Sequence, residues 1–283
     1  MNPSDAVLKT LGYSDNFDFP LTKYEVRLWC PLKITTRKLE NSLKTLLAQK
    51  KIGHKGDYYF LPGRSSLIKT RKSREKYSRS KWAIARKVGE MLAKIPTIQM
   101  IAVTGSLAMN NSTPSDDIDL MIIVKPNTLW PTRLFVWLLL TLKNLRRSPL
   151  ASETTQIRNK ICDNLYLESK QMLIEHPSSY DIYLTHEILQ ALPIFDRDQT
   201  YNRFLNVNSW TSRLLPNHTH SRQRYPTPPT LPFSSFLFFL NLLFYIPQYL
   251  YMKPKMTNEK ASLHAAFFHP NKPLDKGKPG FLK

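Results

Sequence analysis

The sequence predicts an α+β protein, in which a short mixed sheet with flanking helices follows a small N-terminal unit of helices and a hairpin. Two apolar runs of strand length, Ile98–Val103 and Ile118–Val124, are expected to form buried strands of the sheet. The N-terminal unit is indicated by leucines at helical spacing, which precede two apolar segments around a glycine-bearing turn, Gly53–Asp57. The chain has 283 residues, which correspond to roughly two domains.

Residues 1–63 are expected to form the first domain. A short helix comes first, and Thr22 and Glu25 have the spacing of a capping box at the start of a second helix. A third helix is predicted from about residue 36. The hairpin follows, with Lys51-Ile52 and Tyr58–Leu61 as its strands. The order of three helices and a hairpin is that of a winged-helix domain.

Residues 64–96 are expected to form a basic connecting helix, because no Gly or Pro interrupts the segment between Ser65 and Val88. Ten of the side chains between residues 64 and 87 are basic, and Glu75 is the one acid among them. The basic residues are Arg64, Lys69, Arg71, Lys72, Arg74, Lys76, Arg79, Lys81, Arg86 and Lys87. One interpretation is a surface that contacts the phosphates of a nucleic-acid backbone, and the other is a solvated linking helix.

Residues 97–215 are expected to form the α/β part of the chain. The two buried strands named above come first, and a third is predicted at Lys160–Leu167. Helices are predicted at Arg133–Leu145, Asp181–Ala191 and Tyr201–Leu214.

Residues 216–283 change in character. Ser221–Pro232 is rich in Pro, Arg and Thr and is expected to be a linker. Phe233–Met252 is very apolar and just reaches the length of a membrane span, but Asn241, Pro247 and Gln248 interrupt it. We expect a helix packed on the preceding domain, with a membrane helix as the alternative. The last thirty residues are expected to be irregular.

Composition and charge exclude several classes of protein. Two cysteines, Cys30 and Cys162, exclude a disulfide scaffold and a thiolate zinc cluster. The sequence contains neither of the common glycine-rich phosphate-binding motifs. With 41 Lys and Arg against 21 Asp and Glu, the net charge is +20, which favours a polyanion as partner: nucleic acid, nucleotide phosphates or an anionic membrane. The N-terminus has no apolar segment typical of a signal peptide, so we expect a cytoplasmic protein.

The chemistry-bearing segment runs from an apolar strand into Gly105-Ser106 and, after a polar loop, into Asp117-Ile118-Asp119 and the next strand. Strand alternation places the side chains of Asp117 and Asp119 on one face. Two neighbouring carboxylates repel each other, and a divalent cation such as Mg²⁺ removes this conflict. Gly105 lets a phosphate approach the backbone, and the Ser106 hydroxyl can donate to it. A chance Asp-Ile-Asp at the start of a buried strand is the alternative.

This pattern resembles the signature of the DNA polymerase β-like nucleotidyltransferase superfamily, in which Gly-Ser precedes the first of two spaced carboxylates by about ten residues. The resemblance implies that Gly105 and Ser106 hold the phosphates of an NTP and that Asp117 and Asp119 bind Mg²⁺, with two ions as in that superfamily. It also implies a third carboxylate on a later strand, for which Asp163 is the first candidate. Glu168, on the opposite face, and Glu187 are the weaker candidates, and Asp116 is expected to lie in the loop.

The chain as a whole also resembles a group of bacterial proteins with a nucleotidyltransferase domain, which implies the order of the domains and no substrate. The matching segments are Phe17–Thr22, Val103–Met109, Asp116–Val124, Lys160–Leu167, Leu184–Ile188, Tyr251–Thr257 and Phe268–Pro270. Within them, His186 is expected to be a buried, hydrogen-bonded histidine that follows a capping Thr185, with a catalytic or metal-binding role as the alternative. Cys162 is expected to be a small strand residue.

The expected function is therefore an Mg²⁺-dependent nucleotidyltransferase, which moves a nucleoside monophosphate from an NTP to an acceptor hydroxyl. A nucleic-acid-binding regulator, whose nucleotidyltransferase fold senses nucleotide without turnover, is the alternative. Association with a membrane through Phe233–Met252 is the third hypothesis.

Overall fold

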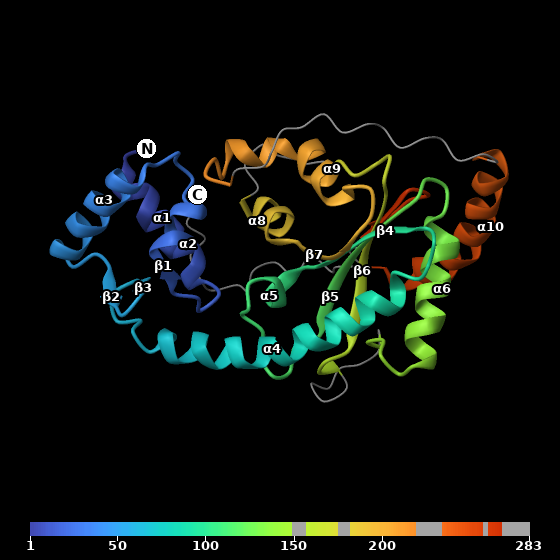
Figure 1. The fold of residues 1–283 in the computed structure, drawn as a ribbon, viewed down its shortest axis with the longest axis horizontal. Coiled ribbons are helices and arrows are strands. Elements are labelled where there is room, and N and C mark those ends of the chain that lie inside the picture. Colours follow the sequence, from blue (N-terminus) through green and yellow to red (C-terminus); the bar gives the residue numbers. More distant parts are fainter. Residues whose placement is uncertain (149–156, 175–181, 219–233, 257–259, 268–283) are drawn as a thin grey trace.

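A small N-terminal unit and a larger sheet domain are joined by one long helix (Figure 1). The computed structural model describes residues 1–148, 157–174, 182–218, 234–256 and 260–267. The whole of the predicted linker Ser221–Pro232 and the last residues of the tail lie outside these ranges. Within them, the prediction of a mixed α+β protein is confirmed.

The N-terminal unit contains three helices and a three-stranded antiparallel sheet of order β1-β3-β2. Its elements are α1 (Pro3–Asp15), β1 (Leu21–Thr22), α2 (Lys23–Leu28), α3 (Thr36–Ala48), β2 (Gly53–Lys55) and β3 (Tyr58–Phe60). The predicted capping box is confirmed, because Thr22 and Glu25 each bond to the other's backbone N–H. The first hairpin strand was predicted at Lys51-Ile52, which is wrong, because β2 begins at Gly53 and includes residues expected to lie in the turn. A Cβ atom at Gly53 would lie 2.3 Å from the Phe60 ring, so this strand position requires glycine.

The second sheet has six strands in the order β7-β4-β5-β6-β9-β8. The strands are β4 (Ile98–Val103), β5 (Ile118–Val124), β6 (Ile161–Glu168), β7 (Leu192–Asp196), β8 (Lys260–Ala261) and β9 (Ala265–Phe267). The pair β5 and β6 is parallel and every other pair is antiparallel, so the sheet is mixed. The three predicted strands are confirmed, whereas β7 and the hairpin β8–β9 were not predicted. The proline at position 193 argued against a strand there, because proline within a sheet is confined mainly to edge strands. β7 is such an edge strand.

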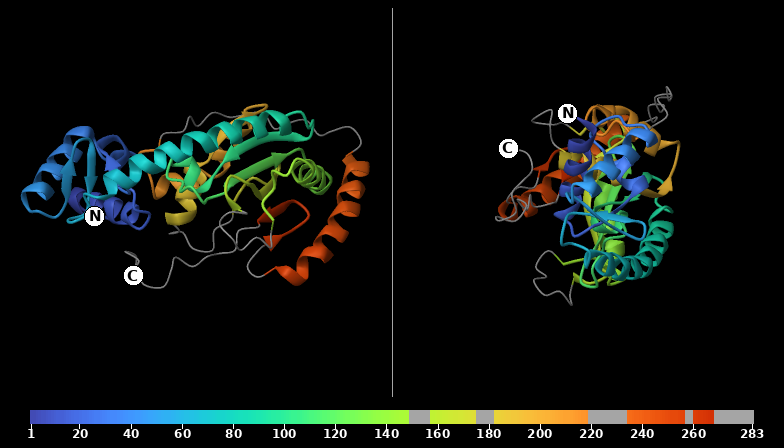
Figure 2. Two further views of the ribbon diagram at one scale, coloured as in Figure 1. Left: turned by 90° about the horizontal axis from the view of Figure 1, so that it is seen from below. Right: turned by 90° about the vertical axis from the view of Figure 1, so that its left-hand side faces the viewer.

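Helices cover both faces of this sheet (Figures 1 and 2). The long helix α4 (Leu67–Leu92) and α6 (Leu129–Leu142) pack on one face, and α8 (Ile182–Gln190) and α9 (Thr200–Val207) pack on the other. The helix predicted at Tyr201–Leu214 is divided, because a 3₁₀ turn at Ser209–Arg213 follows α9.

Helix α10 (Ser234–Met252) lies beside α6, and the predicted packing of this apolar segment is confirmed for one of its faces. The side-chain oxygen of Asn241 accepts a hydrogen bond from the backbone N–H of Trp130 at 2.9 Å. Gln248 donates to the carbonyl of Trp130 at 3.0 Å and accepts from Arg133 at 2.7 Å. The polar residues that interrupt the apolar run are therefore the ones that attach this helix to the domain.

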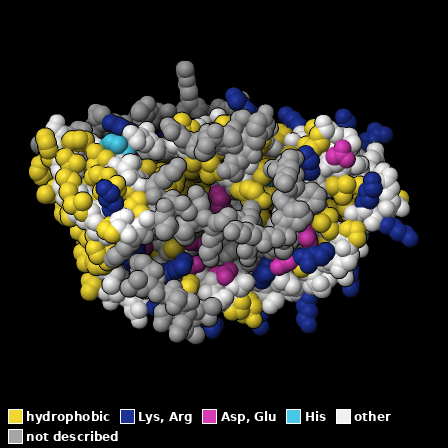
Figure 3. Space-filling view, turned by 180° about the vertical axis from the view of Figure 1, so that it is seen from behind, with side chains coloured by type: hydrophobic (Ala, Val, Ile, Leu, Met, Phe, Trp, Pro, Cys, Tyr) yellow, Lys and Arg dark blue, Asp and Glu magenta, His cyan; other side chains and the backbone are white. Residues whose placement is uncertain are grey.

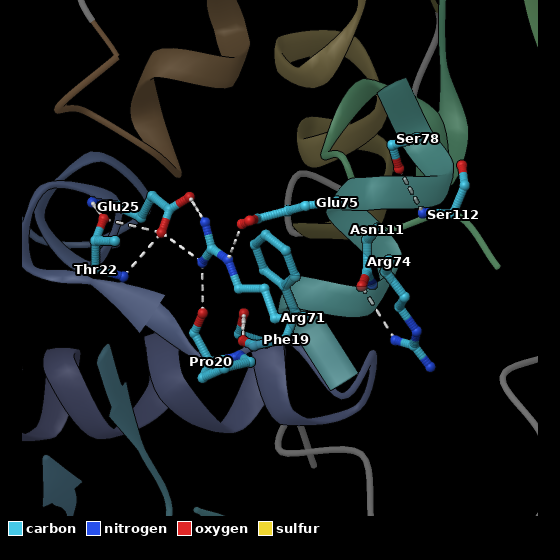
Figure 4. A network of polar contacts seen from close by, with 11 residues as sticks. Phe19, Pro20, Thr22, Glu25, Arg71, Arg74, Glu75, Ser78, Asn111 and Ser112 are labelled. Atoms are coloured by element: carbon cyan, nitrogen blue, oxygen red, sulfur yellow. Dashed lines mark hydrogen bonds and ion pairs between the residues drawn. The ribbon is translucent and has the colours of Figure 1, made fainter. Parts of the chain in front are cut away.

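Polar side chains along one face of α4 connect the N-terminal unit to the sheet domain (Figure 4). Arg71 forms a two-pronged ion pair with Glu25, at 2.8 and 2.9 Å, and its guanidinium lies 4.1 Å from the centre of the Phe19 ring. Farther along the helix, the hydroxyl of Ser78 accepts from the backbone N–H of Ser112 at 3.2 Å. The predicted connecting helix is confirmed, and this face of it is not solvated.

The ten basic residues therefore divide into two groups. Four of them bond to other parts of the chain: Arg64, Arg71, Arg74 and Lys81. The remaining six have exposed side chains: Lys69, Lys72, Lys76, Arg79, Arg86 and Lys87. Neither interpretation of the sequence anticipated that part of the basic run holds the fold together.

Replacing Arg71 with methionine tests the contribution of this ion pair. The Arg71→Met substitution keeps much of the side-chain volume but leaves the half-buried Glu25 carboxylate without its positively charged partner, with the bonds from Thr22 alone. We expect the free energy of unfolding to fall by about 2–4 kcal/mol. The neighbouring Lys72 is exposed, so Lys72→Met is the matched control, with a change of about 0.5 kcal/mol or less. Urea denaturation measures both, and equal values would contradict the prediction.

Candidate active site

Gly105 allows two consecutive segments of the chain to approach each other closely. Strand β4 ends at Val103, and the single turn α5 (Gly105–Ala108) follows it. Gly105 has a φ of 62°, in the left-handed region that favours glycine. A Cβ atom at this position would lie 2.7 Å from a carboxylate oxygen of Asp119. The turn and the carboxylate therefore fit together only because residue 105 has no side chain.

The predicted pair of carboxylates forms a compact cluster at the start of β5. Ligand atoms of Asp117, Asp119 and Cys162 all lie within 4.8 Å of one another. Burial, followed by the negative charges of Asp117 and Glu187, raises the pKa of Asp119 to about 8. Because the folded chain holds this proton far above the ordinary pKa of 3.8, the Asp119 carboxyl makes folding less favourable as the pH rises from about 4 to 8. A bound cation would remove this cost.

The cluster of Asp117, Asp119 and Cys162 could hold a metal ion. Burial raises the pKa of the Cys162 thiol, and the nearby carboxylates raise it further. The carboxylate oxygens of Asp117 and Asp119 are hard donors, whereas a thiol such as that of Cys162 suits softer metals. Mg²⁺ commonly takes one or two carboxylates and completes its shell with water and substrate phosphate.

Two further side chains hold the carboxylates in place, and the sequence did not indicate either. A guanidinium nitrogen of Arg147 lies 2.7 Å from Asp117. The amide of Asn164 donates to Asp119 at 2.7 Å. Asn164 is a polar residue within β6, and its bond to Asp119 accounts for its place in the strand. Arg147 belongs to an Arg-Arg pair whose two members bind different acids.

Asp163 does not lie with the carboxylate pair, which corrects its prediction as the third acid. In the parallel pairing of β5 and β6, Asp163 is opposite Leu120, and Asp119 is opposite Cys162. Asp163 therefore points to the other face of the sheet, where it is 3 % exposed. There it forms an ion pair with Arg146 at 2.8 Å and accepts a hydrogen bond from the Tyr166 hydroxyl at 3.0 Å.

Glu168 lies at the far end of β6, opposite Val124, and pairs with His264 at 2.9 Å. It too is separate from the carboxylate pair. Glu187, the remaining candidate, does lie at the site. Its carboxylate accepts a hydrogen bond from the backbone N–H of Gly105, and the residue as a whole is exposed.

The groups predicted to hold phosphate already have partners within the protein. The Ser106 hydroxyl donates to Asp116 at 3.1 Å, and Asp116 also accepts from the backbone N–H of Thr113 at 2.8 Å. Asp116 is thus a loop residue, as expected, and it shapes the loop that precedes Asp117. Phosphate binding by Ser106 requires exchange of its bond to Asp116.

A cavity of about 330 Å³ opens beside this turn, between the N-terminal unit and α8. Gly105, Ser106 and Glu187 line it, together with aromatic side chains that include Tyr13 and Trp29. His186 is stacked between those two rings, with centroid distances of 4.0 and 4.5 Å. Burial lowers the pKa of His186 to about 3, so the ring is neutral. The expectation of a buried, hydrogen-bonded histidine is confirmed, since Gln190 lies 3.1 Å from its Nδ1 atom. The expectation that Thr185 caps this helix is wrong, because α8 begins at Ile182.

Gly105 and Gly56 provide a matched pair of substitutions. Both have φ near 60°, but a Cβ atom at Gly56 meets nothing within 4 Å. We expect Gly56→Ala to lower the free energy of unfolding by about 1–2 kcal/mol through backbone strain alone. We expect Gly105→Ala to cost about 1–3 kcal/mol more, because Asp119 must move, and to weaken Mg²⁺ binding. Urea denaturation and calorimetric titration with Mg²⁺ measure the two effects, and equal losses in both variants would contradict the prediction.

No family model, curated protein or solved structure matches this chain. The assignment of the site therefore rests on the residues themselves: a paired carboxylate at the start of β5, the glycine turn that faces it, and a third acid contributed by α8.

Proposed function

We propose that this chain is an Mg²⁺-dependent nucleotidyltransferase, which transfers a nucleoside monophosphate from an NTP to an acceptor hydroxyl. The observation that carries the proposal is the Asp117–Asp119 pair, packed against the turn at Gly105, in which the Asp119 charge is unfavourable without a cation. The resemblance of the Gly-Ser and Asp-Ile-Asp pattern to the DNA polymerase β-like superfamily supports the same reaction. A cytoplasmic location stays a prediction from the sequence.

In the proposed reaction, the acceptor oxygen bonds to the α-phosphorus, and the bond from that phosphorus to the bridging oxygen breaks, so that pyrophosphate leaves. When bound, Mg²⁺ neutralises charge on the phosphates. Asp117 and Asp119 hold the cation, and Arg147, which pairs with Asp117, supplies a guanidinium beside them. Glu187 accepts the proton of the acceptor hydroxyl, because its carboxylate lines the cavity beside Gly105 and Ser106.

A transfer assay with four variants tests this proposal. The protein is incubated with each α-³²P-labelled NTP, Mg²⁺, and total cellular RNA and protein as acceptors. We expect Asp117→Asn to abolish transfer and Glu187→Gln to lower it by about 10²–10⁴-fold. We expect Asp163→Asn to lower stability, because it leaves Arg146 unpaired, while transfer by the folded protein continues.

Asp57 is exposed in the hairpin of the N-terminal unit, so Asp57→Asn is the control for loss of one negative charge. Transfer that persists in Asp117→Asn would overturn the proposed reaction. Transfer lost in Asp163→Asn at full stability, but retained in Glu187→Gln, would restore Asp163 as the third acid.

A nucleic-acid-binding regulator is the second candidate, and the exposed face of α4 favours it. Lys69, Lys72, Lys76 and Arg79 recur at intervals of three or four residues, so they form one basic stripe about 15 Å long. This regular row fits the phosphates of a nucleic-acid backbone. In this proposal the N-terminal unit is a winged-helix domain, and the sheet domain senses nucleotide without turnover.

Reversing two charges of the basic stripe tests nucleic-acid binding. Fluorescence anisotropy with labelled duplex DNA and RNA gives the affinity as a function of salt concentration. We expect the double variant Lys72→Glu, Lys76→Glu to reduce the slope of log affinity against log salt by about 2. The exposed Lys170 lies after β6, so Lys170→Glu is the control. Binding that is absent or independent of salt would exclude this candidate, as would an equal effect of the control.

A further inference from the structure

Helix α10 exposes one apolar face although the other packs against α6. Five large apolar residues recur at intervals of three or four along this helix, and each is between 49 % and 66 % exposed. They are Phe236, Phe239, Leu243, Ile246 and Leu250. Helix α6 has a similar row, formed by Phe135, Leu138 and Leu142, in which Leu142 is 83 % exposed.

These eight residues, which we call the apolar face, lie on two neighbouring helices. A groove joins the helices, lined by Phe135 and Leu139 from α6 and by Leu237 and Leu240 from α10. Hydrophobic side chains gather along the corresponding edge of the molecule in the space-filling view, on its left-hand side (Figure 3). Soluble monomers rarely expose so much contiguous apolar surface unless it binds something.

The contacts of α10 are those of a helix that lies along the protein rather than one that crosses a bilayer. It is the one helix in the described ranges with the length and hydropathy of a membrane span. However, its Asn241 side chain is fully buried and bonds to the backbone of Trp130 and Leu263. Removal of α10 into a membrane would break these bonds and the ones made by Gln248.

The charges around the apolar face are positive. Lys94 lines the groove, Lys143 follows α6 and Lys253 follows α10, and all three are exposed. The segments 125–148 and 234–256, which contain both helices, include no Asp or Glu. A two-fold pairing of this face with a second copy would set two positively charged surfaces against each other. An anionic surface complements them.

We propose that the apolar face binds the surface of an anionic phospholipid bilayer. In this arrangement the Phe, Leu and Ile side chains enter the boundary between headgroups and acyl chains, α6 and α10 lie parallel to the membrane, and the lysines contact lipid phosphates. The proposal does not depend on the nucleotidyltransferase activity.

Vesicle flotation with the full chain tests the proposal. The vesicles are made of phosphatidylcholine, with or without phosphatidylglycerol. We expect the protein to float with the anionic vesicles, less so at high salt, and to be released by alkaline carbonate. We expect the double variant Phe239→Glu, Leu243→Glu to lose affinity for the anionic vesicles by about tenfold or more. Both side chains are exposed in the wild type, so the fold should persist, which circular dichroism checks.

The control is Val207→Glu, because Val207 is exposed at the end of α9, outside the apolar face. Light scattering gives the oligomeric state of every variant. The proposal would be overturned if the protein does not bind anionic vesicles. Resistance to carbonate extraction would also overturn it, because it indicates a helix that spans the membrane. A dimer that the double substitution dissociates, with no binding to vesicles, would show that the apolar face binds a second copy instead. Equal loss of binding in Val207→Glu would also contradict the proposal.

Discussion

Buried polar side chains on one face of α4 set the position of everything else in the molecule. Lys81 is 1 % exposed, and its ammonium group donates to the backbone carbonyl of Asp116 and to the side chain of Asn159. Three turns earlier, Arg71 makes its ion pair with Glu25 of the N-terminal unit. A buried charge that loses its partner is strongly destabilising, so the helix is fixed both near its start and at its middle. The loop before Asp117 is therefore positioned by the same helix that positions the N-terminal unit.

In this arrangement, the N-terminal unit and the sheet domain each line one side of the cavity beside Gly105. Tyr13 and Trp29 come from the N-terminal unit, and Glu187 comes from α8. A change in the angle of α4 would thus alter the cavity and the loop that carries Asp117 together. In the two functions proposed above, a polyanion on the basic stripe and a nucleotide in the site would both contact parts of the chain that α4 positions, which offers a physical route for coupling between them.

Features that depend on neighbouring residues in the chain could be predicted from the sequence. Features that depend on how two strands are aligned with each other could not. The capping box at Thr22 and the spacing of Asp117 and Asp119 depend on neighbouring residues, so they could be predicted. Asp163 could not be placed, because the face that it occupies depends on its alignment with Leu120 in the neighbouring strand. A shift of one residue would have brought it to the carboxylate pair. The contact between Arg147 and Asp117 could not be predicted either, because the two residues are thirty positions apart in the chain.

The apolar face and the basic stripe lie on different parts of the molecule, which has a consequence for how the protein can act. Helices α6 and α10 are at the end opposite the N-terminal unit, and α4 runs between the two ends (Figure 2). A bilayer bound at α10 therefore leaves the N-terminal unit directed away from the lipid. The anionic membrane does not compete for Lys69, Lys72, Lys76 and Arg79, because the lysines beside the apolar face are different ones. Attachment to a membrane is thus compatible with access of a large polyanion to α4 and of nucleotide to the cavity.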